Sequence, residues 1–287
     1  MKVLVLGSTG QVGSALVSLL RDQAIALDFP EVDLSTPGKL PSILDRFPCD
    51  AVINAAAYTQ VDRAEREEDL ARAINGEAPG VLAKECCDRD IPFIHYSTDY
   101  VFSGEGTRPW REEDPVSPLS AYGRTKLLGE KKVAEAGGKW LVFRTSWVYD
   151  AKGKNFLNTM LRLAGERDQL RVVSDQRGAP TYAPHLAAAT LQALESASAL
   201  PEFPSGSYHL CNAGETGWNE FAREIFESAG KSVKVEAIFS ADYPTPARRP
   251  LNSRLDTGKA KKILGVALPD WREGLRECMR EKMNASH

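Results

Sequence analysis

Two residues with reactive side chains share one helix-like stretch. The segment "SAYGRTK", residues 120 to 126, places Tyr122 four residues before Lys126. If Ser120 caps a helix here, both side chains lie on one face, with Cβ atoms about 5–6 Å apart. A nearby ammonium favours a phenolate and lowers the pKa of a phenol from its usual value near ~10. We therefore predict that Tyr122 donates a proton and that Lys126 tunes it; two surface residues on a shared helix face are the alternative.

A hydroxyl and a carboxyl group follow an apolar stretch. In "PFIHYSTDYVF" the residues Ser97, Thr98 and Asp99 come at the end of a strand-like run. Ligands of open parallel sheets bind beyond the carboxyl ends of the strands. A threonine hydroxyl at that place can donate to an oxygen on which negative charge develops while a tyrosine protonates it. The alternative is a turn or helix-cap cluster, which these residue types form readily.

The chain opens with a glycine pattern typical of phosphate binding. In "VLVLGSTGQVGSALVSLL" the glycines Gly7, Gly10 and Gly13 stand between a strand-like run and an amphipathic helix. Glycine lets the backbone approach a pyrophosphate, and a helix N-terminus offers free N–H groups. The pattern predicts dinucleotide binding. Asp28, after the second run, and Asp33 are rival candidates for a contact with the adenosine ribose, and each is otherwise a solvated loop carboxylate.

Short apolar runs alternate with segments of helical period. Runs that are apolar on both faces and separated by helix-length connections indicate a parallel sheet covered on both sides. We predict a doubly wound, Rossmann-like α/β domain. The predicted strands are 3–7, 24–28, 51–56, 92–98 and 140–145.

The alternation loosens after Tyr149, which predicts a smaller C-terminal substrate-binding lobe. Segments 155–166 and 185–197 have helical character, and 206–211 resembles one more strand. We assign 1–149 to the dinucleotide-binding domain, expect 183–213 to complete that domain, and assign 150–182 and 214–287 to the lobe.

Composition excludes several classes of partner. With Lys+Arg 36 against Asp+Glu 39 the net charge is −3, so no basic field is available for nucleic acid or an anionic membrane. The 5 cysteines show no CxxC pair, which suits reduced thiols in a cytoplasm. The chain has no export leader and no transmembrane stretch, so we expect a cytoplasmic protein, either a monomer or a homodimer.

Several longer motifs resemble one family. The stretches "GSTGQVG", "NAAAYTQVDRAE", "HYSTDYVF", "SPLSAYGRTKLLGE", "FRTSWVY", "NFLNTMLRLA", "DQRGAPT" and "RPLNSRL" are similar to the dTDP-4-dehydrorhamnose reductase family of extended short-chain dehydrogenases/reductases. They span nearly the whole chain. "STDYVF", "RTSWVY" and "DQRGAPT" together are more specific than the general reductase motifs.

The resemblance implies a reaction and a set of site residues. It implies NADPH- or NADH-dependent reduction of the C4 ketone of dTDP-4-dehydro-β-L-rhamnose to dTDP-L-rhamnose. Tyr122, Lys126 and Thr98 would be catalytic, and Thr98, Asp99 and Trp147 would bind the sugar nucleotide, although a tryptophan after a strand is more often a packing residue. The cofactor would be lined by Gly7, Gly10, Gln11, Val12, Gly13, Asp33, Leu34, Ala57, Tyr58, Thr59, Tyr122 and Lys126.

No metal is predicted. The four histidines, His95, His185, His209 and His287, have no spacing typical of metal ligands. Some family members form a magnesium-linked dimer through two glutamates. Ala15 and Pro184 occupy those positions here, so we expect no such bridge.

Two other functions use the same scaffold. A nucleotide-sugar epimerase or dehydratase is one, but dehydratases usually carry an acid directly after Thr-Asp, where this chain has Tyr100. A non-catalytic dinucleotide-binding regulatory subunit is the other, and the intact tyrosine and lysine argue against it. Arg248, Arg249 and Arg254 are candidates for forked hydrogen bonds to a diphosphate, or are solvated loop residues.

Overall fold

The computed structural model describes residues 1–284; His287 and the last two residues of an "NAS" glycosylation triplet at 284–286 lie outside this range. Six parallel strands form the central sheet in the order β10-β5-β4-β3-β1-β2. Their bounds are β1 (Val3–Leu6), β2 (Ala24–Leu27), β3 (Ala51–Asn54), β4 (Phe93–Thr98), β5 (Trp140–Thr145) and β10 (Gly206–His209). The predicted doubly wound α/β fold is therefore confirmed.

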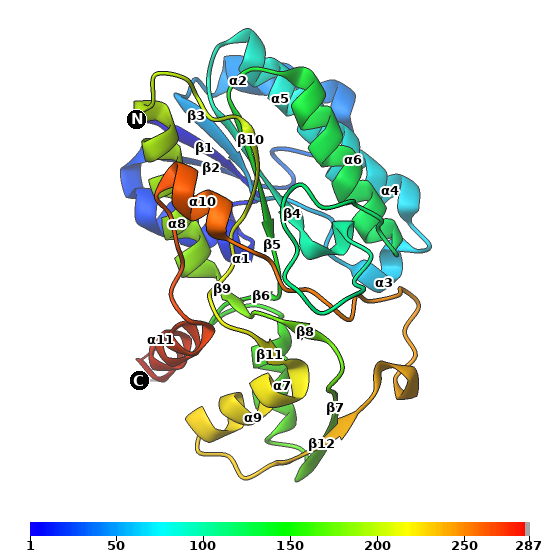
Figure 1. Cartoon of the computed structure of the whole chain (residues 1–287). Coiled ribbons are helices and arrows are strands. Elements are labelled where there is room, and N and C mark those ends of the chain that lie inside the picture. Colours follow the sequence, from blue (N-terminus) through cyan, green and yellow to red (C-terminus); the bar gives the residue numbers. More distant parts are fainter. Residues whose placement is uncertain (285–287) are drawn as a thin grey trace.

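Two helical layers cover the sheet (Figure 1). One contains α1 (Gln11–Leu20), α8 (Ala183–Ala199) and α10 (Gly258–Leu264); the other contains α2 (Ile43–Arg46), α4 (Glu68–Arg72), α5 (Ala78–Asp88) and α6 (Ala121–Ala136), with α3 (Val61–Ala64) near the N-terminus of α6. Strand side chains alternate between two cores. Val3 and Val5 pack toward α1 and α8, whereas Leu4 and Leu6 pack toward α5. Strands buried on both faces explain the uninterrupted apolar runs in the sequence.

The lobe lies beyond the end of β5 (Figure 1). It has its own core, in which Phe221, Trp271 and Leu157 are fully buried or nearly so. Its helices are α7 (Phe156–Leu163), α9 (Trp218–Ser228) and α11 (Trp271–Asn284), and its strands pair as β12 (Lys234–Ile238) with β7 (Gln169–Val173), β11 (Thr216–Gly217) with β8 (Arg177–Gly178), and β6 (Val148–Tyr149) with β9 (Thr181–Tyr182).

The two parts are connected at the glycine turn and by the C-terminal segment. The Gln11 side chain accepts a hydrogen bond from Asn155 Nδ2 at 2.9 Å, and Asn155 caps α7 of the lobe. Residues 258–268 return to the sheet domain, where Ala260, Leu264 and Val266 join the core beneath α8, although the sequence placed them in the lobe. Among residues 1–284 no helix is long and apolar enough to cross a membrane.

Candidate active site

Helix α6 presents Tyr122 in its first turn. Ser120 caps the helix as predicted, because its side-chain oxygen accepts a hydrogen bond from Gly123 N at 3.2 Å. A Cβ at position 123 would lie 2.3 Å from the carbonyl oxygen of Tyr100, so only glycine lets the helix approach that segment. The Tyr100 ring then meets the Tyr122 ring edge-on at 5.6 Å. The phenol is thereby fixed at the carboxyl end of β4.

The Tyr122 phenol is coupled to Thr98 rather than to Lys126. Burial raises the pKa of Tyr122 above its usual range, the Asp99 charge raises it further, and a hydrogen bond with Thr98 lowers it. The sequence predicted instead that the pKa of Tyr122 is lowered by Lys126. The difference arises because the buried phenolate is poorly solvated and because the Lys126 side chain is directed to His95 instead.

Thr98 and Asp99 form a buried polar pair at the end of β4. Thr98 Oγ1 donates to Asp99 Oδ1 at 3.0 Å and accepts from Tyr100 N at 3.2 Å. The other carboxylate oxygen, Asp99 Oδ2, is buried without a hydrogen-bond partner, and burial raises the pKa of Asp99 to about 6, partly offset by the nearby Ser253 and Thr98 hydroxyls. A buried oxygen without a partner is costly. It therefore suits a ligand that brings a hydroxyl group.

Lys126 lies one turn further along α6 and is 2 % exposed. Its Nζ is 3.1 Å from His95 Nε2, and His95 Nδ1 is 3.2 Å from Asn54 Nδ2. Burial lowers the pKa of Lys126 to about 7, although Glu130 acts in the opposite direction. No ion pair of Lys126 is found within residues 1–284. A buried amine without a carboxylate partner is suited to the hydroxyl groups of a bound cofactor.

The glycine turn has the geometry of a pyrophosphate cradle. Gly7 has φ +76°, and a Cβ on Gly13 would lie 1.9 Å from the Gly7 carbonyl oxygen. Gly10 is the N-cap of α1 and provides no side-chain cap, so the first N–H groups of α1, beginning at Gln11 and Val12, are available to an anion. The residues present therefore fit a dinucleotide phosphate group.

The two candidate ribose contacts hold local turns. Asp28 Oδ2 accepts from Thr9 N at 2.8 Å and from Thr9 Oγ1 at 2.6 Å. Asp33 Oδ1 accepts from Ser35 N at 2.9 Å. Hydrogen bonds from Thr9 lower the pKa of Asp28 against the effect of its burial, and those from Ser35 lower the pKa of Asp33. Both groups are anionic at neutral pH.

The segment Ala57 to Thr59 is held by a buried asparagine. Asn75 Oδ1 accepts from Tyr58 N at 2.8 Å, and Asn75 Nδ2 donates to Tyr58 O at 3.0 Å. Leu34 is 7 % exposed and packs in the core, so it has mainly backbone atoms to offer a cofactor. Both segments lie beyond the ends of β1 to β3, where the glycine turn also lies.

Trp147 connects the strand end to the lobe. Its backbone has φ 51°, which is unusual for a residue with a side chain. The ring stacks on Trp218 of α9 at 3.7 Å, and a Cβ on Gly178 would lie 2.9 Å from Trp147 Cε2. Such a strained residue held by its neighbours is characteristic of functional sites.

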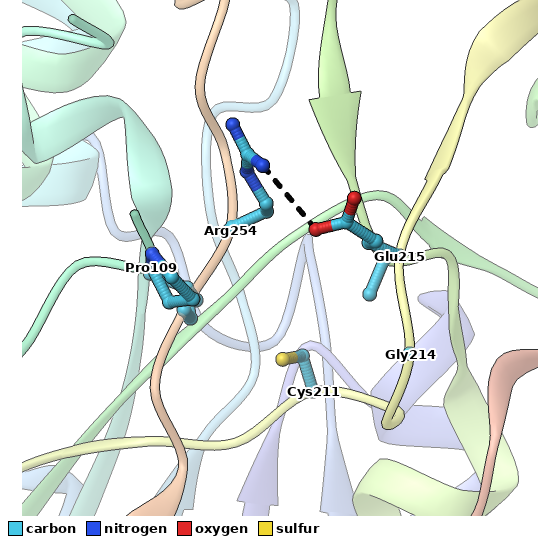
Figure 2. Close-up of a pocket in the computed structure, with 7 residues that line it drawn as sticks. Pro109, Cys211, Gly214, Glu215 and Arg254 are labelled. Carbon is cyan, nitrogen blue, oxygen red and sulfur yellow. Dashed lines mark hydrogen bonds and ion pairs between the residues drawn. The ribbon is translucent and has the colours of Figure 1, made fainter. Parts of the chain in front are cut away.

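A cavity of about 230 Å³ is lined by residues that include Pro109 and Gly214 (Figure 2). Arg254 and Glu215 line it and form an ion pair at 3.3 Å. Cys211 forms another part of its wall; burial raises the pKa of that thiol, and the Asp99 charge raises it further. Arg249 instead binds Asp62 at 2.8 Å. Of the three candidate arginines, Arg254 is the one that lines this cavity.

Neither position of the magnesium bridge carries a ligand. Ala15 packs in the core, and Pro184 lies in the first turn of α8. Within the described part of the chain, no group of three or more His, Cys, Asp or Glu side chains could hold a metal ion.

Four buried polar residues of this region were not found from the sequence: Asn54, Asn75, His95 as a partner of Lys126, and Ser253. Only His95 carried a signal, as an imidazole inside the largely apolar run 92–98. The others are ordinary polar residues until the fold brings them to Lys126, Tyr58 and Asp99.

A dinucleotide cradle, a buried lysine and a tyrosine beside a strand-end hydroxyl define an oxidoreductase of the short-chain dehydrogenase/reductase type. Residues 1–284 match the family described as the RmlD substrate binding domain. The chain belongs to this family of dTDP-4-dehydrorhamnose reductases.

Curated relatives and solved structures agree. The dTDP-4-dehydrorhamnose reductase of Burkholderia thailandensis is 46% identical over 297 residues, covering 99% of this chain and 100% of the relative. That of Escherichia coli K12 is 44% identical, with 98% of each chain covered. A crystal structure of a dTDP-4-dehydrorhamnose reductase from Clostridium acetobutylicum superposes with TM-score 0.93 at 35% identity, covering 99% and 100% of the two chains. The Bacillus anthracis enzyme in complex with NADP gives TM-score 0.91 at 32% identity, covering 98% and 100%.

Proposed function

We propose that this chain reduces the C4 ketone of dTDP-4-dehydro-β-L-rhamnose to dTDP-L-rhamnose with NADPH or NADH. The observation that carries the proposal is the juxtaposition of Tyr122 and Thr98 at the carboxyl end of β4, one helical turn from a buried Lys126. The cofactor, when bound, supplies a hydride. The chain's own residues must hold the ketone, supply the proton and stabilise the charge that develops on oxygen.

Tyr122 is the proton donor. Its raised pKa keeps the phenol protonated at neutral pH before reaction, and its contact with Tyr100 holds the ring in place. Thr98 donates a hydrogen bond to the same ketone oxygen, and to do so its hydroxyl turns away from Asp99. With a cofactor bound, Lys126 would hold its ribose hydroxyls and add positive charge, which would make the tyrosine a stronger acid than in the free protein.

The substrate lies between the strand ends and the lobe. Asp99 Oδ2, buried without a partner, accepts a sugar hydroxyl, and the Trp147 ring forms an apolar wall for the sugar. Arg254 offers a guanidinium to the diphosphate from the cavity wall (Figure 2), exchanging Glu215 for a phosphate. We assign the cofactor to the glycine turn, Asp33, Leu34 and the segment Ala57 to Thr59, and the sugar nucleotide to the lobe, from which residues 258–268 are excluded because they pack in the sheet domain.

The place of an extra acid is taken by Tyr100. Because residue 100 is a tyrosine, this position provides no carboxyl group for dehydration. Its hydroxyl accepts a hydrogen bond from Arg249 Nη1 at 3.4 Å. The geometry therefore favours reduction over dehydration on this scaffold. We further propose a cytoplasmic location, which suits the five free cysteines, and a monomer or homodimer without nucleic acid or membrane partners.

One assay tests the proposal. Purified protein, NADPH and a panel of keto sugar nucleotides are mixed, and loss of reduced nicotinamide is followed by absorbance. The expected result is one cofactor oxidised per molecule of dTDP-4-dehydro-β-L-rhamnose, with a saturated 6-deoxy sugar nucleotide as product. Cofactor oxidation with no member of the panel would refute a reductase. Product that keeps the ketone, with no net cofactor consumption, would instead indicate an epimerase.

A further inference from the structure

A chain of hydrogen bonds runs from a backbone N–H just after β3, through a side chain of β4, to the Lys126 amine on α6. Ala56 N donates to Asn54 Oδ1 at 3.2 Å, which orients the side-chain amide. Asn54 Nδ2 then faces His95 Nδ1 at 3.2 Å, and His95 Nε2 faces Lys126 Nζ at 3.1 Å. Asn54 and His95 are 0 % exposed, so water does not compete for these groups.

Each donor in this chain needs an acceptor. An amide nitrogen only donates, so the nitrogen that faces Asn54, His95 Nδ1, must accept and carry no proton. A neutral imidazole then carries its proton on Nε2 and donates it to Lys126 Nζ, which accepts only as an uncharged amine. Burial is the largest of the effects that lower the pKa of His95 well below its usual value, so the ring is neutral.

We propose that His95, oriented by Asn54, is a positioning residue that donates Nε2–H to Lys126 and holds this lysine as a neutral amine until the cofactor binds. On binding, the amine takes up one proton from solvent and becomes the ammonium that faces the ribose. This inference rests on the proposed function only in giving Lys126 a cofactor-binding role.

The surrounding charges are consistent with a neutral amine. Glu130, on the same helix, is held by Arg144 of β5 through bonds of 2.9 Å and 2.7 Å, so its charge is already compensated. From the neighbouring elements, Glu68 of α4 pairs with Arg124, and Glu77 pairs with Lys132. Asp99 faces Tyr122 and Thr98. None of these carboxylates forms an ion pair with Lys126.

The tautomer of His95 is a direct test that needs no activity. The cofactor-free protein is labelled with ¹⁵N-histidine and recorded by NMR above and below neutral pH. The His95 signals are assigned with His95→Gln, or by single replacement of the other three histidines if that variant does not fold. Protonation at Nε2 above neutral pH, where a pKa of about 7 leaves Lys126 uncharged, supports the proposal. Protonation at Nδ1 at that pH, or an imidazolium that forms near neutrality, overturns it.

Proton uptake provides the second test. NADPH binding is measured by titration calorimetry at about pH 8 in two buffers of different ionisation enthalpy. The wild type is expected to take up close to one more proton than Lys126→Met, because the amine is neutral beforehand. Equal uptake by both overturns the proposal. Neither measurement uses the sugar substrate, so a failure of the proposed function would show only in the turnover assay.

Two substitutions separate positioning from packing. His95→Gln retains an N–H donor and should keep the Kd for NADPH within about threefold, whereas His95→Leu should raise it about tenfold, the effect of one lost buried hydrogen bond. Tyr96→Phe is the matched control, since Tyr96 is on the opposite face of β4 and loses its 2.7 Å bond to Thr190. It should leave Kd unchanged. Equal effects of the two His95 variants would show a packing role only.

Discussion

Replacing Glu130 by glutamine should destabilise the protein strongly, because the carboxylate is one half of a buried ion pair. Glu130 and Arg144 have side chains that are each 6 % exposed and joined by bonds of 2.9 Å and 2.7 Å. Ser97 Oγ also donates to Glu130. Removing one partner of such a pair leaves the other charge buried without compensation, which costs about 3–5 kcal/mol.

The expected loss lies at the lower end of that range. Glutamine keeps the size of glutamate and one acceptor oxygen, so Glu130→Gln should lower the free energy of unfolding by about 3 kcal/mol, or roughly a hundredfold in the folded-to-unfolded ratio. Because Glu130 supports the charged form of Lys126, the variant should also lower the pKa of Lys126 below about 7.

Urea unfolding followed by circular dichroism measures the effect. The matched control is Glu68→Gln. It breaks an ion pair between Glu68 of α4 and Arg124 of α6, the helix that also carries Glu130, and the two side chains are 46% and 45% exposed. Exposed pairs contribute at most about 1 kcal/mol. If Glu130→Gln loses no more than the control, the buried pair does not stabilise this end of the sheet, and our description of the base of the site is wrong.

Three further predictions concern the cofactor and the sugar. Gly13→Ala should abolish NADPH binding, measured by fluorescence titration, because its Cβ would lie 1.9 Å from a carbonyl oxygen, whereas Gly38→Ala, with nothing within 4 Å, should bind normally. Asp99→Asn should lower turnover yet raise the free energy of unfolding at about pH 8 by about 3 kcal/mol. The pKa of Asp99 is raised to about 6, so the free energy of unfolding of the wild type falls as pH rises from about 4 to about 6. Denaturant titrations across that pH window should show no such loss in Asp99→Asn. Asp28→Ala should shift kcat/KM toward NADPH relative to NADH; an unchanged ratio would mean that this carboxylate does not face the ribose.

The sheet was predictable because its strands are buried on both faces. The strands within the runs at 3–7, 51–56 and 92–98 are buried on both faces, and helix-length segments separate them, so a parallel doubly wound sheet follows. The lobe was less readable. Strand β7 alternates exposed and buried residues, and its partner β12 lies far along the chain, so neither shows a signal until the two pair.

The site shows the same division. The placement of the tyrosine, the lysine and the glycine turn was predictable because local spacing on one helix or turn determines their geometry. The contact between His95 and Lys126 was not predictable, because it depends on the pairing of β3 with β4 and on the packing of α6 against β4. Nor could the sequence give the pKa of Tyr122, which depends on how deeply the fold buries the ring and on the Asp99 charge beside it.

The most direct test of the central claim is the turnover of Tyr122→Phe with NADPH and dTDP-4-dehydro-β-L-rhamnose. The ring contact with Tyr100 remains, so the variant should fold and bind NADPH with a Kd within about twofold of wild type. Its kcat should fall at least about a hundredfold, the contribution expected of a positioned proton donor. A variant that retains more than about half of the wild-type kcat would contradict the assignment of Tyr122 as the acid.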